Sequence, residues 1–248
     1  LQGGTPAGLS RPLQVWNALP TAVRHRAARL LRANYRPLWF GFGPPAEVAF
    51  RARATFRRQH EVAVEDEVDV LLFGLPDVGP GSVRSAQNPV LAAELALGYV
   101  YHLFTQRPLL RQGGAIIVAN PLTPEFDRAH QPHHEFYEKV LRQERDPKAI
   151  RERFEAYFAG RPEFVAGYER RFGFHGVHPL HAWYHCAPAR RRASRIFAAH
   201  GDPRSCARLG FTPVMNVEDG LLKAREALGK DPLDVAVLEV TPPFWVKV

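Results

Sequence analysis

The chain has 248 residues, of which 46% are hydrophobic, which is enough for one large α/β domain with a buried core or for two small domains. Its formal charge of +8 raises the possibility of nucleic-acid binding. However, arginine far outnumbers lysine among the basic residues, and the sequence contains no recognised nucleic-acid-binding motif. We therefore expect neither DNA nor RNA as a partner.

Three further features bear on where the protein resides. The longest apolar stretch, residues 89–104, is interrupted by Glu94 and His102 and is shorter than the ~20 apolar residues of a membrane-spanning helix. No signal-peptide pattern begins at Leu1. Cys186 and Cys206 are too few for a disulfide framework and fit a reducing compartment. The sequence thus predicts a cytoplasmic protein without a membrane span.

Residues 1–36 are expected to precede the main domain. A tail rich in Gly and Pro comes first, followed by a basic stretch with Leu19, Val23, Ala27 and Leu30 at helical spacing, which ends before Pro37. This pattern predicts a linker and a basic amphipathic helix. A solvated helix resting on the domain is the leading interpretation, and contact with an anionic membrane surface or a partner is the alternative.

From residue 37 to 248 the pattern alternates between helices and short apolar strands. We expect strands at 68–76, 113–121, 194–200 and 234–240, with helices at 46–60, 88–104, 203–210 and 216–229 and a helical insertion between 135 and 173. This order predicts an α/β fold: an open, mostly parallel sheet flanked by helices. In such sheets the ligand crevice lies beyond the carboxyl ends of the strands.

No phosphate-binding loop is present in this predicted sheet. Neither GxGxxG nor GxxxxGK[ST] occurs, and the glycines of GLPDVGPG are accompanied by prolines, which remove backbone donors that a phosphate would need. A self-contained nucleotide-binding domain is therefore not expected.

The segment FHGVHPLHAWYHC, residues 174–186, contains His175, His178, His181 and His185. Its spacing suits zinc ligands, which leaves open a metal hydrolase built on the first three of these. Because Pro179 prevents one continuous helix, we expect the four rings not to share a face, and HxxH without an intervening Glu lacks the base of a metalloprotease. The favoured interpretation is a crevice-lining segment without a metal.

A second group, His130, His133 and His134, lies in the loop HQPHH. We expect this group to cap the following helix rather than to bind a metal. For a hydrolase triad the sequence contains no GxSxG elbow, and neither cysteine has the helix-entry setting of a nucleophile.

Several runs together carry a resemblance to a known family: VDVLLFGLPDVGP, QNP before a long helix, PLLRQGGAIIVANPLTPEFD, EFYEKVL, FHGVHPLHAWY and LGFTPVMNVEDGLLKAREAL. The sequence from residue 37 to 248 resembles the C-terminal half of lactate-racemase-like proteins, the nickel-pincer family. The resemblance implies half of a racemase or epimerase that interconverts 2-hydroxy acids by hydride transfer to and from a nickel-carrying pyridinium nucleotide.

The same resemblance implies which functional groups belong to which domain of the enzyme. The catalytic histidines and the lysine that tethers the nickel-pincer nucleotide belong to the family's N-terminal domain, so this chain alone is expected to bind no cofactor and its own catalytic residues stay unknown. The chain begins at Leu1 and its only methionine is Met215, from which we expect the N-terminal catalytic domain, its main partner, to be missing. It would be an isomerase only when joined to that domain.

Substrate-facing groups are expected in the loop and helix start after the first strand, residues 77–88. Asp77, Arg84, Gln87 and Asn88 are the candidates there, because Arg84 can pair with a carboxylate and the amides can cap the helix or bind substrate. His175 and His178 complete the predicted substrate-binding set. This stretch lacks the Tyr-Gln pair and the Lys of the family's lactate racemases, so lactate itself is not the expected 2-hydroxy acid.

One alternative of a different class remains. The chain can instead be a non-catalytic α/β binding module that recognises a carboxylate or a sugar acid without turning it over. The racemase interpretation predicts an adjacent domain with paired histidines and a lysine, whereas the binding module predicts none.

Overall fold

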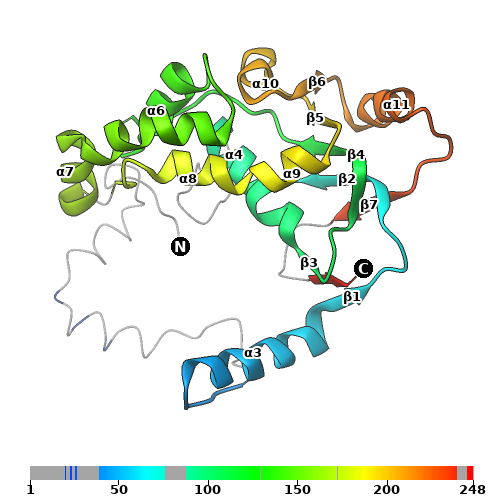
Figure 1. The fold of residues 1–248 in the computed structure, drawn as a ribbon, viewed down its shortest axis with the longest axis horizontal. Coiled ribbons are helices and arrows are strands. Elements are labelled where there is room, and N and C mark those ends of the chain that lie inside the picture. Colours follow the sequence, from blue (N-terminus) through cyan, green and yellow to red (C-terminus); the bar gives the residue numbers. More distant parts are fainter. Residues whose placement is uncertain are drawn as a thin grey trace.

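The computed structural model describes residues 39–75, 88–128, 130–171, 173–238 and 245–247, together with residues 20, 23 and 26. Its centre is a five-stranded sheet in which every neighbouring pair is parallel (Figure 1). The strand order is β6-β5-β4-β2-β7. The strands are β2 (Val68–Gly74), β4 (Leu110–Ala119), β5 (Arg195–Ala199), β6 (Thr212–Val214) and β7 (Val235–Leu238). The predicted α/β fold is confirmed.

The two central strands are built around runs of apolar residues, residues 70–73 in β2 and 115–119 in β4. In β2 and β4 the pairs Leu71–Ile116 and Phe73–Val118 lie side by side in register. Strands covered on both faces are apolar along their whole length rather than at alternate positions. All four predicted strands are present. The prediction missed β6, which has only three residues and contains a proline.

Helices cover both faces of the sheet. One face packs against α4 (Pro89–Ala93), α8 (His178–His185), α9 (Ala187–Arg192) and α10 (Pro203–Leu209). The other packs against α11 (Val217–Leu228). At Gly220 of α11 an added Cβ would lie 3.2 Å from the Cγ2 atom of Ile117, so this glycine lets the helix approach the sheet closely.

The predicted long helix after β2 is present but irregular. After α4 the chain continues as the π-helix η2 (Glu94–Tyr99) and the 3₁₀ turn η3 (Val100–His102). A second π-helix, η4 (Phe136–Val140), follows the short α5 (His133–Glu135). Because π-helical turns are rare and concentrate at functional sites, the residues around these two segments are candidates for a functional site.

The helical insertion is completed by α6 (Pro147–Gly160) and α7 (Pro162–Arg171), as predicted. Asp146 caps α6: its carboxylate accepts a hydrogen bond of 2.8 Å from the backbone N–H of Ala149. The indole N–H of buried Trp183 in α8 donates a 2.8 Å bond to the carbonyl of Arg145, which ties the insertion to the helices on the sheet.

The strand order places a topological switch point between β2 and β7. Chain order proceeds from β2 through β4 and β5 to β6 on one side, and then returns to β7 on the other side of β2. Ligand crevices of open α/β sheets lie beyond the carboxyl ends of the strands at such a point. The segments that directly follow these two strands, residues 76–87 and 239–244, lie outside the described residues.

A second, smaller sheet was not predicted. It consists of β1 (Glu61–Ala63), β8 (Trp245–Lys247) and β3 (Phe104–Thr105), all parallel. The helix α3 (Pro45–His60), which was predicted, leads into β1 and projects from the rest of the molecule (Figure 1).

Of the predicted basic helix within residues 1–36, only residues 20, 23 and 26 are described, so that prediction lies largely outside the described residues. None of the helices in the described ranges is long and apolar enough to cross a membrane.

Candidate functional site

The carboxyl edge of the sheet contains strained backbone. Leu122, shortly after β4, has φ of 49°, and His200, directly after β5, has φ of 59°. These left-handed conformations are uncommon for residues other than glycine, and they cluster at functional sites. The carboxamide oxygen of Asn120 accepts a 2.8 Å bond from the N–H of Leu122, and the N–H of Asp202 donates to the carbonyl of Pro121 at 2.8 Å. These bonds hold the two strand ends in place.

Asn88 begins α4 at the same edge of the sheet, because α4 follows the carboxyl end of β2. Its carboxamide oxygen accepts hydrogen bonds from the N–H groups of Val90 at 3.0 Å and Leu91 at 3.5 Å. Its amide nitrogen donates to the side-chain oxygen of Gln131 at 3.1 Å. Asn88 is 1% exposed and Gln131 is 5% exposed. Asn88 therefore serves as the N-cap of α4 and also orients the Gln131 side chain.

Next to Gln131 lies a pair of imidazoles from two segments far apart in the sequence. The Nε2 atom of His133, in α5, lies 3.1 Å from the Nδ1 atom of His178 at the start of α8. Phe174 packs against both rings, with centroids 5.1 Å from His133 and 4.5 Å from His178. His133 is completely buried. Among the described residues its Nδ1 atom is the one buried side-chain nitrogen or oxygen without a hydrogen-bond partner.

Both rings of this pair are neutral at physiological pH. Burial lowers the pKa of His133 well below its ordinary value, and the neighbouring His178 and His134 lower it further. Burial also lowers the pKa of His178 to about 4, with smaller contributions from His181 and His185. Desolvation disfavours the charged imidazolium, so these rings act as hydrogen-bonding groups rather than as cations.

The arrangement of the histidines confirms one prediction and corrects another. Pro179 occupies the first turn of α8, where a proline is tolerated, so His178, His181 and His185 lie at positions i, i+3 and i+7 and share one face of that helix. His175 lies before this helix, so the four rings do not all share one face, as predicted.

The expectation that His130, His133 and His134 cap the next helix is wrong, because no side chain caps α5. His134 contacts the carbonyl of Gln131 through Nδ1, and His130 contacts the carboxylate of Asp127.

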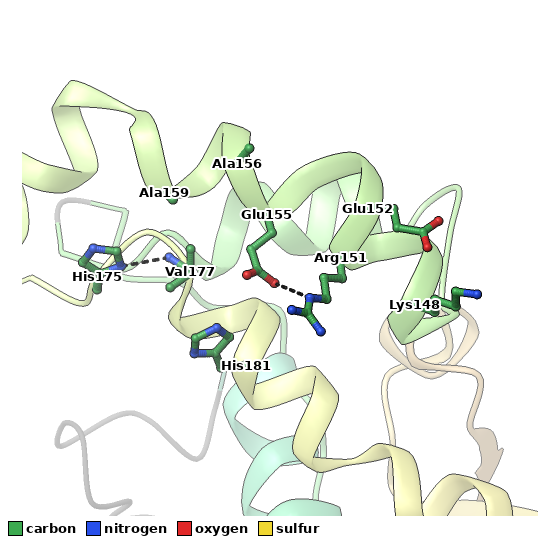
Figure 2. Close-up of a pocket in the computed structure, with 9 residues that line it drawn as sticks. All are labelled: Lys148, Arg151, Glu152, Glu155, Ala156, Ala159, His175, Val177 and His181. Carbon is green, nitrogen blue, oxygen red and sulfur yellow. Dashed lines mark hydrogen bonds and ion pairs between the residues drawn. The ribbon is translucent and has the colours of Figure 1, made fainter.

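His175 lies before α8, where its Nδ1 atom accepts a 3.3 Å hydrogen bond from the N–H of Val177. It borders an open pocket of about 760 Å³ between α6 and α8 (Figure 2). The pocket is lined by Lys148, Arg151, Glu152, Glu155, Ala156, Ala159, His175, Val177 and His181. It mixes acidic and basic groups, and the Nε atom of Arg151 lies 4.0 Å from the carboxylate of Glu155. His175 therefore faces a different space from the buried pair.

One buried carboxyl group close to α8 was not recognised as a candidate from the sequence. Glu94 opens the π-helix η2 and is 7% exposed. Burial raises its pKa to about 7. A Cβ added to Gly98 would lie 3.5 Å from Cγ of Glu94 and 3.2 Å from Cβ of His185, so the absence of a side chain at Gly98 allows η2 and α8 to pack closely.

Of the six predicted substrate-binding residues, the structure describes Asn88, His175 and His178. Asp77, Arg84 and Gln87 lie outside the described residues. Sequence reasoning missed Gln131 and the buried role of His133. The sequence contained one signal for this site: two histidine motifs, HQPHH and HxxH, flank one helical insertion. They come together when that insertion folds back.

The described part of the chain contains no group of three or more His, Cys, Asp or Glu side chains placed to hold a metal ion. Cys186 and Cys206 are free and buried, and burial raises the pKa of Cys206 to about 11. A buried thiol with a raised pKa is a poor nucleophile. Among the described residues, the site offers hydrogen bonding by amides and neutral imidazoles.

Comparison with known proteins gives a similarity of fold. No protein-family model matches this sequence, and no curated protein matches it either. Among solved structures, the lactate racemase apoprotein from Thermoanaerobacterium thermosaccharolyticum is similar, with a TM-score of 0.48 and 12% sequence identity over 81% of this chain. The chain spans 40% of the length of that protein. At this identity the similarity concerns the path of the chain alone.

Proposed function

We propose that this chain is the substrate-side domain of a nickel-dependent racemase or epimerase that acts on a 2-hydroxy acid. The observation that supports it best is the convergence of the starts of α4, α5 and α8 beside the carboxyl edge of a parallel sheet. There the Asn88–Gln131 and His133–His178 pairs assemble, with bonds of 3.1 Å in each pair. Ligand sites of open parallel sheets form at this edge.

The groups in these pairs suit a 2-hydroxy acid. Such a molecule carries a carboxylate and a neighbouring hydroxyl, and both need hydrogen-bond partners when they leave water. Gln131 is held by Asn88, and His178 is held by His133, so both are oriented before a ligand arrives. Preorganised groups bind without the loss of side-chain freedom that a mobile residue incurs.

The proposal assigns the redox chemistry to a second domain. When bound, a nickel-pincer nucleotide would supply the hydride acceptor. The described residues of this chain do not fit a nickel site, because they provide no group of three or more metal-binding side chains. In this proposal the chain binds the acid, orients it and excludes water, while the second domain provides the cofactor and the proton acceptors.

The test begins with the coding sequence directly upstream of Leu1. If it encodes an in-frame α/β domain with spaced histidines and a lysine, the joined protein is expressed in cells supplied with nickel. One enantiomer of each of several 2-hydroxy acids is then incubated with the protein, and the products are separated by chiral chromatography. We expect the opposite enantiomer to form from at least one acid, and to form only with nickel.

Two outcomes contradict the racemase proposal. One is an upstream sequence without such a domain. The other is a nickel-loaded joined protein that converts none of the acids. If calorimetry then shows that the chain binds a carboxylate or a sugar acid, the non-catalytic binding module replaces the racemase.

A further inference from the structure

The pair formed by His133 and His178 restricts where each ring can carry its proton. A neutral imidazole has one N–H donor and one acceptor nitrogen. The 3.1 Å contact between Nε2 of His133 and Nδ1 of His178 is a hydrogen bond only if one of these atoms carries the proton and the other accepts it. The pair therefore has two possible arrangements, and they present opposite groups to solvent.

In the first arrangement Nε2–H of His133 donates to Nδ1 of His178. His178 then carries its own proton on Nε2, and Nδ1 of His133 is a bare acceptor. In the second arrangement Nδ1–H of His178 donates to Nε2 of His133. His178 then exposes a bare Nε2, and His133 has to carry a proton on its Nδ1.

The burial of His133 decides between the two arrangements. Its Nδ1 atom is buried and has no partner within the described residues. Orphaned buried N–H donors are rarer in proteins than acceptors that lack a partner. The first arrangement leaves an unsatisfied acceptor at this atom, whereas the second leaves an unsatisfied donor. The first arrangement is therefore the more stable one.

We infer that His133 fixes His178 in the Nε2–H form, so that His178 donates a hydrogen bond to the carboxylate of a small organic acid. The inference rests on the proposed function for the identity of the acid, but not for the position of the proton. In this form His178 is a donor and cannot take the proton from the substrate hydroxyl. His133 is then a positioning residue that acts through His178.

The surroundings of His178 agree with an anionic ligand. His178 is only partly buried, and within the described ranges its Nε2 atom has no hydrogen-bond partner, so this nitrogen is the one left to meet a ligand. Besides burial, His181 and His185 lower the pKa of His178, and neither of these side chains carries negative charge. A carboxylate at Nε2 would therefore meet a donor without repulsion from those neighbours.

The position of the proton can be observed directly. In the full chain labelled with ¹⁵N-histidine, two-bond proton–nitrogen correlation spectra at pH 7 distinguish a protonated ring nitrogen from a bare one. We expect His178 to show a protonated Nε2 and a bare Nδ1. The opposite pattern overturns the inference, because His178 would then be an acceptor suited to act as a base.

The ligand is tested with glycolate, the smallest 2-hydroxy acid, and with ethylene glycol, which has the hydroxyl groups but no carboxylate. We expect glycolate to shift the Nε2–H resonance of His178 and ethylene glycol to leave it unchanged. Equal shifts with both compounds, or no shift with saturating glycolate, overturn the assignment of a carboxylate.

Variants separate the donor from the ring that positions it. His178→Ala is expected to weaken glycolate binding about tenfold, which corresponds to about 1.4 kcal/mol for one lost hydrogen bond to a charged group. His178→Gln keeps an N–H donor and is expected to retain most of the affinity. His133→Phe keeps the aromatic packing, and the Nδ1–H form of His178 is expected to appear in its spectrum.

The control is Glu226→Gln, which changes an exposed side chain of α11 on the other face of the sheet and is expected to leave both the spectrum of His178 and the affinity for glycolate unchanged. An incorrect position of the proton can be distinguished from an incorrect proposed function. A joined, nickel-loaded protein that racemises nothing refutes the racemase while leaving the proton on Nε2. A bare Nε2 refutes the inference even if the enzyme is active.

Discussion

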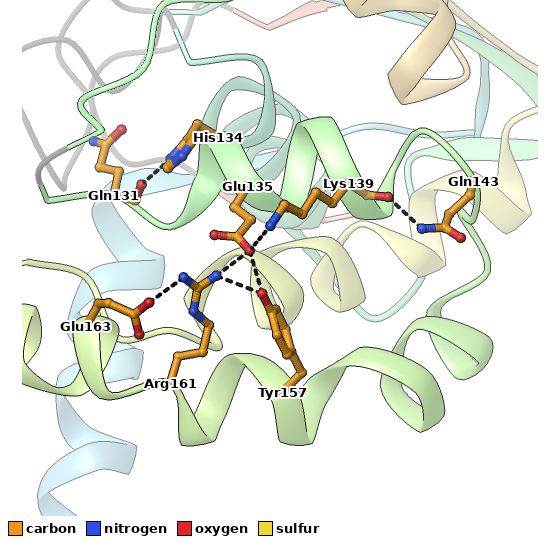
Figure 3. Close-up of polar contacts among 8 residues, drawn as sticks. All are labelled: Gln131, His134, Glu135, Lys139, Gln143, Tyr157, Arg161 and Glu163. Carbon is orange, nitrogen blue, oxygen red and sulfur yellow. Dashed lines mark hydrogen bonds and ion pairs between the residues drawn. The ribbon is translucent and has the colours of Figure 1, made fainter.

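Two buried ionisable side chains, His133 and Glu135, lie in the same short helix and have opposite surroundings. Glu135 is 7% exposed, and its carboxylate accepts hydrogen bonds from Lys139 at 2.8 Å, Tyr157 at 2.8 Å and Arg161 (Figure 3). Burial raises the pKa of Glu135, but these hydrogen bonds and the charge of Arg161 outweigh it and lower the pKa overall. By contrast, His133 keeps one nitrogen without a partner.

The contrast separates a structural polar group from a candidate functional one. Of the partners of Glu135, Tyr157 lies in α6, Arg161 directly follows α6, and Lys139 lies in η4. The network therefore joins the segments of the helical insertion. Removing one member of a buried ion pair is strongly destabilising, because the remaining charge is left without compensation. A buried group that lacks a partner contributes less to stability, and its presence calls for another explanation. For His133 that explanation is the orientation of His178.

The largest expected effect comes from breaking the complete network. Glu135→Ala leaves Arg161 and Tyr157 without their shared acceptor and is expected to lower the free energy of unfolding by about 3 kcal/mol, as measured by urea denaturation. The matched control is Glu163→Gln, which removes the exposed partner of Arg161 and is expected to change stability by less than ~1 kcal/mol. Equal effects of the two variants would show that the network is not what holds the insertion together.

The next effect concerns Glu94, another buried carboxyl group. Because its folded pKa is about 7, above the ordinary 4.5, the folded state holds a proton that the unfolded state releases, and stability is lost as the pH rises from 4.5 through 7. Glu94→Gln removes this loss. We expect the variant to be more stable than the native protein by about 2 kcal/mol at pH 8 and equally stable near pH 4.5.

Thermal and urea denaturation of Glu94→Gln at the two pH values measure this difference. The exposed Glu152→Gln variant serves as the control, with no change expected at either pH. A gain at pH 8 that persists at pH 4.5 would mean that the amide improves packing rather than removing a buried charge.

A third effect tests the neutral state of the histidine pair. Both folded pKa values lie below the ordinary 6.5, so the unfolded chain takes up protons first, and stability is expected to fall as the pH drops from about 6.5 toward 4. His133→Phe removes one of these protons and is expected to reduce the slope of stability against pH by up to about 1.4 kcal/mol per pH unit. Urea denaturation between pH 6.5 and pH 5 gives the slope, and an unchanged slope would show that His133 is not held neutral.

The smallest expected effect is at the cap that orients Gln131. Asn88→Ala removes the acceptor for the first N–H groups of α4 and is expected to lower stability by about 1 kcal/mol, whereas Asn88→Asp keeps the capping oxygen and loses the donor to Gln131. If both variants weaken glycolate binding, the contact with Gln131 matters for the ligand. If only the alanine variant does, the helix start matters instead.

Much of the fold could be predicted from the local sequence pattern. Runs such as VLLFG and GGAIIVA are apolar at every position, as expected of a strand covered on both faces, and the helices between them carry recognisable starts at Pro89, Pro147 and Pro203. The small sheet was missed because β1, β3 and β8 have two or three residues each and pair across most of the chain. Segments this short have too few residues to show a period.

The candidate site was readable only in part, and for a different reason. The sequence identified His178 and Asn88 as candidates and marked HQPHH as unusual, because residue types and spacing are properties of the chain itself. It could not show that His133 and His178, separated by 45 positions, share a hydrogen bond, or that Asn88 holds Gln131 across 43. Nor could it show that burial makes both rings neutral. Those properties depend on which segments pack together, and the closure of the helical insertion over the sheet decides them.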